Sequence, residues 1–144
     1  MTGVPDAARQ RALDAFSPAD TATLVALRRD LHQHPELSWK EERTAGRLVD
    51  ALRSLGAVDV RRVAGTGVIA RVPGTTPGAP VVAVRGDIDA LPIHEETGLE
   101  YQSTVAGVMH ACGHDVHATW TIGAAMQLLA RPAVGDVIVV LQPA

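Results

Sequence analysis

Cysteine, aromatic residues and long apolar runs are scarce in this sequence, and each scarcity excludes a class of protein. Its 144 residues include one cysteine, which cannot form an internal disulfide and indicates a reducing cytoplasm. No apolar run approaches the roughly 18 residues of a membrane span, and charged residues interrupt residues 1–16 where a signal peptide would be apolar. Aromatic residues make up 3% of the chain, so alanine, valine and leucine must build the core.

A strong excess of charge of either sign is also missing. The net charge of -3 provides no attraction to nucleic acid or to an anionic membrane, and no such partner is expected. The arginine pairs at 28–29 and 61–62 are therefore interpreted as solvated faces. A chain of this length corresponds to one domain.

Apolar spacing and end signals predict alternating helices and strands. Helices are expected over residues 17–34, with Ser17 as N-cap and Pro35 as stop, over the segment 38–55, and from His114 or Asp115 to about Ala130. For the second helix, Ser38 and Glu41 form the pattern of a capping box, and Gly56 is the stop. Strands are expected at 58–63, 66–72, 81–86 and 135–142.

The third of these strands, "VVAVRG", is a continuous apolar run, the pattern of a strand buried on both faces of a sheet. The fold class is therefore α/β, a sheet covered by helices. Asp87 and Asp89 follow this strand, at the edge where open α/β sheets carry their ligands. Their i, i+2 spacing directs both carboxylates the same way if strand geometry persists, although aspartates there could equally be turn formers.

The segment "MHACGHDVHATW", residues 109–120, gathers His110, Cys112, His114, Asp115 and His117. Packing offers no reason for such a concentration, because each buried polar group needs a partner, and a metal would supply one. Gly113 allows a tight bend, so that a thiolate and an imidazole could converge on one ion. Two alternatives stay open here: Asp115 could cap the helix that follows, and His117 could face the metal site or solvent.

A second reading makes Cys112 a nucleophile with a histidine as base. Residues at i, i+2 do not readily form that hydrogen bond, and the two aspartates would then be unexplained, so metal chemistry is favoured. Trp120, Met126 and Leu128 are interpreted as core residues.

Three long blocks resemble one family in the same order. Residues 27–56, 81–103 and 107–130, which begin "LRRDLHQHPELSWKEE", "VVAVRGDIDALP" and "GVMHACGHDVHA", are similar to N-acyl-amino-acid amidohydrolases, the branch with hippurate hydrolases and auxin-conjugate hydrolases. The resemblance implies a co-catalytic metallopeptidase-type, zinc-exopeptidase-like domain. It also implies two divalent ions, zinc or manganese, and a small-molecule substrate whose amide bond is cleaved to a carboxylic acid and an amino acid.

The resemblance also suggests roles for individual residues. Cys112 and His114 correspond to metal ligands, and Asp89 to the aspartate that supports the metal site. Asp87, Asp115 and His117 are additional or supporting candidates, and the "HQHPELS" segment with His34 and Glu36 is interpreted as structural.

The chain ends at "VVLQPA", where relatives continue into two glutamates, the general base and a metal ligand. Glu95 and Glu96 match a loop of the family and not its base. Residues 1–144 are therefore expected to be an incomplete N-terminal portion of the catalytic domain, without the inserted dimerisation domain and inactive by themselves, while the full-length protein is expected to be a homodimer. The alternative is a non-enzymatic metal-binding or interaction fragment. The "VIVVL" strand and its neighbours are expected to lack sheet partners encoded later in the full-length protein, and therefore to expose apolar edges.

Overall fold

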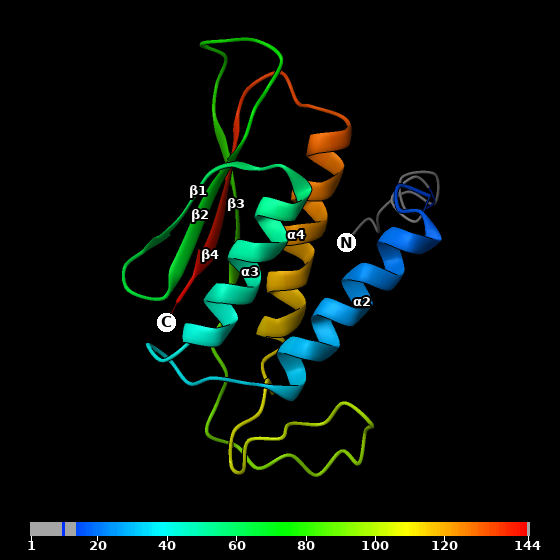
Figure 1. The fold of residues 1–144 in the computed structure, drawn as a ribbon, viewed down its shortest axis with the longest axis vertical. Helices are drawn as coiled ribbons and strands as arrows, with labels where there is room; N and C mark the ends of the chain where they lie inside the picture. Colours follow the sequence, from blue (N-terminus) through cyan, green and yellow to red (C-terminus); the bar gives the residue numbers. More distant parts are fainter. Residues whose placement is uncertain (1–9, 11–13, 144) are drawn as a thin grey trace, which may run out of the picture.

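The structure, a computed structural model, describes residue 10 and residues 14–143. Figure 1 shows a sheet with helices on one side of it. In chain order the elements are α2 (Pro18–Gln33), α3 (Glu42–Leu55), β1 (Val58–Val63), β2 (Gly67–Val72), β3 (Val82–Asp87), α4 (His114–Ala130) and β4 (Val137–Gln142). The expected α/β class is confirmed, and the helices and strands lie where they were expected, except that the second helix begins at Glu42 and not near Ser38. No described helix has the length and apolar character needed to cross a bilayer.

The sheet has the strand order β1-β2-β4-β3. β1 and β2 form an antiparallel hairpin, β2 is antiparallel to β4, and β3 is parallel to β4, with Val84 opposite Val139. A parallel pair needs a crossover connection, and the segment between β3 and β4 contains α4. The long loop 88–113 precedes α4 and lies at the same end of the molecule as the carboxyl end of β3 (Figure 1).

The core lies between the sheet and the helix layer. α3 packs on β1 and β2, α4 packs on β3 and β4, and α2 packs on α4 (Figure 1). The expectation of an aliphatic core is confirmed, because the buried cluster consists of leucine, valine, isoleucine and alanine: Leu27, Leu31, Ala45, Leu48, Val49, Leu52, Val68, Ala70, Val72, Ile88, Ala118, Ile122, Ala125, Val137, Val139 and Leu141.

The N-terminal cap predicted for α2 is confirmed. The Ser17 side chain accepts from the backbone N–H of Asp20 at 3.1 Å, and the Asp20 carboxylate accepts from the backbone N–H of Ser17 at 3.0 Å. These two bonds form a complete capping box and satisfy backbone donors that the helix itself leaves unpaired.

The capping box predicted for α3 is wrong. The helix begins at Glu42, and Glu41 at the N-cap forms no capping bond with its side chain. The cap comes instead from Glu36, whose carboxylate accepts from the backbone N–H groups of Arg43 and Thr44 at 3.0 and 2.7 Å. Ser38 donates to Asp89 instead. Glu36, interpreted from the sequence as structural, thus caps α3 from a preceding loop.

Two expectations about the strands are also wrong. β3 is an edge strand rather than a central one, and Val82 is 60% exposed, so "VVAVRG" is not buried on both faces. β4, which contains "VIVVL", has partners on both sides, so the expected lack of partners is wrong for this strand. Its neighbour β3 does form an edge with an exposed valine, as was expected. An apolar run indicates that its side chains favour burial. Which strand lies at the centre of the sheet depends on the strands available elsewhere in the chain to pair with it.

The helix residues predicted as core divide into two groups. Leu128 packs against the core cluster and Met126 is half-buried, whereas Trp120 is 68% exposed. The interpretation of Trp120 as a core residue is therefore wrong. Its ring lies beside His117, with the ring centroids 6.0 Å apart, and is largely accessible to solvent.

Candidate metal centre

The carboxyl end of β3 and the first turn of α4 lie next to each other and carry several of the polar residues singled out in the sequence. Gly86 allows this approach, since a Cβ at that position would lie 2.5 Å from Thr121 Oγ1 and 2.6 Å from the carbonyl oxygen of His117. Asp87 ends β3 beside the same turn, with Oδ2 3.9 Å from His117 Nδ1.

Asp87, His114 and His117 form a group that could hold a divalent cation. One ligand atom from each residue lies within 4.8 Å of the other two. The two imidazoles are three residues apart on α4 and stack, with their ring centroids 5.3 Å apart. Two nitrogen donors and a carboxylate are a donor set that zinc accepts readily. Of the residues whose role was open in the sequence, Asp87 and His117 thus join His114.

Asp89 orients His114. Its Oδ1 lies 2.7 Å from His114 Nδ1, and its backbone carbonyl oxygen lies 3.0 Å from the same nitrogen. Asp89 is 8% exposed, and its other carboxylate oxygen accepts from Ser38 Oγ at 2.9 Å. With Nδ1 donating to Asp89, the lone pair of His114 is on Nε2, which is the arrangement that an outer carboxylate imposes on a metal-binding histidine.

Asp87 also has a positively charged partner, Arg85. Its Oδ1 accepts from Arg85 Nη2 at 2.5 Å, and Arg85 Nε donates to Gln142 at the same distance. Asp87 at the end of β3 and Asp89 two residues later thus both lie near His114, one in the group of possible ligands and one through a hydrogen bond.

Cys112 lies in the turn before α4 and is exposed. Gly113 has φ of 79°, the left-handed bend expected between Cys112 and His114. The thiol is nevertheless not part of the three-residue group. Of the two strongest candidates from the sequence, His114 is in the three-residue group and Cys112 is not. The ligand role of Cys112 therefore stays a prediction.

Asp115 is buried and contacts α2 rather than the three-residue group. Its Oδ2 lies 2.7 Å from His32 Nδ1 and 2.9 Å from Arg28 Nε. It does not cap α4 either, since its Oδ1 accepts only from the adjacent Val116 N–H. Arg28, expected on a solvated face, instead pairs with this buried carboxylate.

Sequence reasoning did not identify two further residues beside the site, His32 and Glu95. The second ring nitrogen of His32 lies 3.2 Å from Glu95 Oε1. Burial by itself would raise the pKa of Glu95, but hydrogen bonds from Thr97, Ser103 and His32 hold the pKa of this carboxyl below its ordinary value. His32 and Asp115 are 83 residues apart, so no local spacing could have indicated the contact.

His110 is 4% exposed and packs beside His32, with the ring centroids 6.4 Å apart. Among the described residues neither of its ring nitrogens has a hydrogen-bond partner. Burial lowers the pKa of His110 to about 4 despite the opposing effect of the Asp115 carboxylate, so the ring is neutral at pH 7.

The comparison with known families agrees with this geometry. A family model described as peptidase family M20/M25/M40 matches residues 83–144, which contain all of β3 except Val82, together with α4 and β4. The matched part of the chain thus has the sequence pattern of a family of metal-dependent hydrolases, and the relatives below agree with it.

Three proteins illustrate the similarity. An N-acyl-L-amino acid amidohydrolase of Geobacillus stearothermophilus is 50% identical over 102 residues, which are 71% of this chain and 27% of that protein. The YXEP protein of Bacillus subtilis, described as a dinuclear metal-binding peptidase from the M20 family, has a TM-score of 0.81 at 46% identity, over 85% of this chain and 35% of that one. A Rhodococcus jostii protein named as a glutamate–cysteine ligase is 48% identical over 125 residues, 87% of this chain.

The last of these matches covers 16% of the relative's length, so the ligase name describes a protein that is mostly outside the match. The chain spans between 16% and 35% of the length of these three proteins. The comparisons thus identify the family pattern and the fold of this segment. They do not assign it the activity of a whole protein.

Proposed function

We propose that this chain provides part of the active site of a metal-dependent amidohydrolase that cleaves N-acyl amino acids to a carboxylic acid and an amino acid. The observation that carries the proposal is the group of Asp87, His114 and His117, with His114 oriented by the buried Asp89. The similarity to an N-acyl-L-amino acid amidohydrolase supports N-acyl amino acids as the substrate class. Hippurate-like conjugates are a narrower proposal within that class.

In this proposal His114 Nε2, His117 and Asp87 bind metal, Cys112 is a further ligand, and Asp89 holds the His114 ring. The donors fit zinc or manganese, and the complete site would hold two ions. When bound, such ions lower the pKa of a water molecule and polarise the amide carbonyl. The short Asp89–His114 hydrogen bond keeps the ring in the tautomer that presents Nε2.

The general base is proposed to lie outside residues 1–144. Glu95 is held by His32, Thr97 and Ser103, with its side chain 3% exposed, and Glu96 is not in the three-residue group. A base must reach the water from which it takes the proton, and its loss costs about 10²- to 10⁴-fold in rate. The chain alone is therefore expected to be inactive.

The remaining expectations belong to the whole protein. We regard residues 1–144 as an N-terminal portion of the catalytic domain, and a homodimer and a cytoplasmic location stay predictions. The alternative of a Cys112 nucleophile finds no support in the contacts, because among the described residues no imidazole is hydrogen-bonded to its thiol. The alternative of a non-enzymatic metal-binding fragment is separated by the assay below.

Zinc titration of the purified chain, followed by calorimetry, tests the metal assignment. The His114→Ala, His117→Ala double variant should lose at least about 100-fold in affinity, because each imidazole is a direct donor. Cys112→Ala should also weaken binding, while His94→Ala, which removes an exposed imidazole outside the group, should not. Zinc affinity that is unchanged in the double variant would refute the assignment.

Hydrolysis of N-benzoylglycine and N-acetyl amino acids with added zinc or manganese tests the activity. The chain should show no turnover, while the full-length protein should hydrolyse them. Turnover by the chain at the full-length rate would place the base within residues 1–144. A full-length protein that binds zinc but cleaves no N-acyl amino acid would favour the non-enzymatic alternative.

A further inference from the structure

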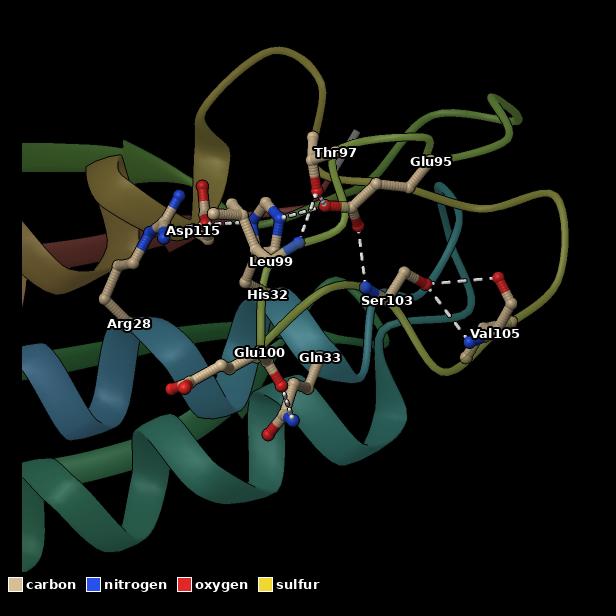
Figure 2. Close-up of polar contacts among 10 residues, drawn as sticks. All are labelled: Arg28, His32, Gln33, Glu95, Thr97, Leu99, Glu100, Ser103, Val105 and Asp115. Carbon is tan, nitrogen blue, oxygen red and sulfur yellow. Dashed lines mark hydrogen bonds and ion pairs between the residues drawn. The ribbon is translucent and has the colours of Figure 1, made fainter.

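A buried polar network joins α2, the loop 88–113 and α4 behind the metal centre. Figure 2 shows His32 between two carboxylates, with Asp115 on one ring nitrogen and Glu95 on the other. The side chains of His32, Asp115 and Glu95 are 4%, 0% and 3% exposed. Arg28, from the preceding turn of α2, completes the network through Asp115.

Such a network is costly unless each polar atom is satisfied. Removing carboxylates from water is unfavourable, and well-packed apolar residues are often at least as stabilising in the same place. Here the Glu95 carboxylate also accepts from Thr97 Oγ1 at 2.5 Å and from the Ser103 N–H at 2.6 Å. The network therefore specifies how three separate segments are arranged, which an apolar cluster would do less strictly.

The loop side of the network is fixed to α2 at several points. The Thr104 N–H and hydroxyl both donate to the Gln33 carbonyl oxygen, at 2.8 and 2.7 Å. The Tyr101 ring contacts His32 edge-on, with the ring centroids 5.7 Å apart, and Arg29 lies 4.8 Å from the Tyr101 centroid. Because this loop carries both Asp89 and Cys112, its attachment to α2 bears on the metal centre.

The helix side of the network is the first turn of α4. Asp115 directly follows His114, and α4 has Gly113 at its N-cap with no side-chain capping bond. The beginning of the helix therefore depends on tertiary contacts for its position, and the buried Asp115 carboxylate provides them through His32 and Arg28. A shift of that turn would move His114 and His117 together.

We propose that His32 is a positioning residue for the metal centre: by bridging Asp115 and Glu95 it fixes the first turn of α4 and the adjoining loop, so that His114 and His117 face Asp87. The role rests on the proposed metal site and adds to it a histidine of α2 that touches none of the three ligand residues in the described contacts. Asp115 transmits the constraint, and the Glu95 contact holds the loop against the same ring.

Cobalt(II) binding to the full chain tests this role, since the visible absorption spectrum of bound cobalt reports the arrangement of its ligands. Losing an outer partner of a metal ligand costs about 10- to 100-fold in affinity, and His32 acts one contact further away, so His32→Ala should lower cobalt affinity by about three- to tenfold and should change the spectrum. His32→Asn can place an amide N–H near the Nδ1 position and should restore affinity in part through Asp115.

Leu31→Ala is the matched control. Leu31 is the neighbouring residue on α2 and is fully buried in the core, so its truncation destabilises the fold without removing a network contact. At a temperature where circular dichroism shows every variant folded, Leu31→Ala should keep the wild-type cobalt affinity and spectrum. If His32→Ala does not fold, Asp115→Asn, which preserves the shape of the carboxylate, is measured in its place with the same expectation.

The outcomes separate this role from the metal assignment. If the wild type binds cobalt, and His32→Ala binds it with an affinity within twofold of the wild type and with the same spectrum, the positioning role is overturned. The proposed ligands are then unaffected. An equal effect of Leu31→Ala would also overturn it, because the loss would then reflect general loosening. A wild-type chain that binds no cobalt would refute the metal assignment, and the positioning role with it.

Discussion

Asp89 allows the sharpest test of the candidate site, because it acts on a ligand without being one of the three grouped residues. Its carboxylate is nearly buried and lies 2.7 Å from His114 Nδ1, a short charge-assisted hydrogen bond. Removing the carboxylate should free the His114 ring to rotate and should lower its basicity. Zinc affinity should therefore fall in Asp89→Ala.

The size of the effect follows from the second acceptor. Outer partners of metal-binding histidines are worth about 10- to 100-fold in affinity. The Asp89 backbone carbonyl oxygen, 3.0 Å from Nδ1, remains in Asp89→Ala, so we expect a loss near tenfold, about 1.4 kcal/mol. Asp89→Asn keeps a neutral acceptor of roughly half the strength and should lose about threefold.

Calorimetric zinc titration at constant ionic strength measures both losses. Asp50→Ala, which removes one exposed carboxylate of α3, is the control for the change in net charge and should bind as the wild type does. We expect zinc affinity to decrease from the wild type to Asp89→Asn and further to Asp89→Ala. Two results would show that the hydrogen bond to His114 does not orient a ligand. One is a zinc affinity of Asp89→Ala within twofold of the wild type, and the other is a loss of affinity in Asp89→Ala no larger than the loss in Asp50→Ala.

Two further predictions concern the fold. Glu36→Ala should destabilise the chain by about 1 to 2 kcal/mol in urea unfolding, because α3 loses the carboxylate that caps it, and Glu36→Gln should lose less; a change below about 0.5 kcal/mol would contradict the cap. The Gly74 N–H and then Arg71 hold the pKa of Asp136 below its ordinary value. The ionised Asp136 carboxylate therefore contributes to stability above about pH 4, and this contribution is lost as the pH falls through the lowered pKa of the folded state. Asp136→Asn should flatten the acid side of the plot of unfolding free energy against pH. An unchanged slope would exclude this role.

Local signals predicted the helices well where the interacting groups are close in sequence. Ser17 and Asp20 are three residues apart, and their reciprocal bonds formed as the pattern indicates. Ser38 and Glu41 have the same pattern, yet Ser38 donates to Asp89 and Glu41 accepts from Thr66. A local cap forms only when no tertiary partner competes for the same side chains, and here buried partners from distant segments do compete.

The candidate site divides in a similar way. His114 and His117 are one turn apart, so a helix starting at His114 is enough to bring them together, and Asp89 could be matched to them through the family resemblance. The contacts of His32 with Asp115 and Glu95 span 83 and 63 residues, and no periodicity within a segment contains them. Glu95 lies in the loop, as the sequence indicates, but its contact with α2 through His32 could not be predicted from its neighbours.

The sequence by itself determined the local part of this protein: the order and extent of helices and strands, the bend at Gly113, the aliphatic core and the concentration of possible ligands near residue 114. These features depend on backbone preferences and on neighbours within a few residues. The tertiary structure alone decided that β3 lies at the edge, that Trp120 is exposed and that Asp115 turns to α2. The hydrophobicity and charge of a side chain determine whether it favours burial or a polar partner. The packing of distant segments determines which partner is within reach.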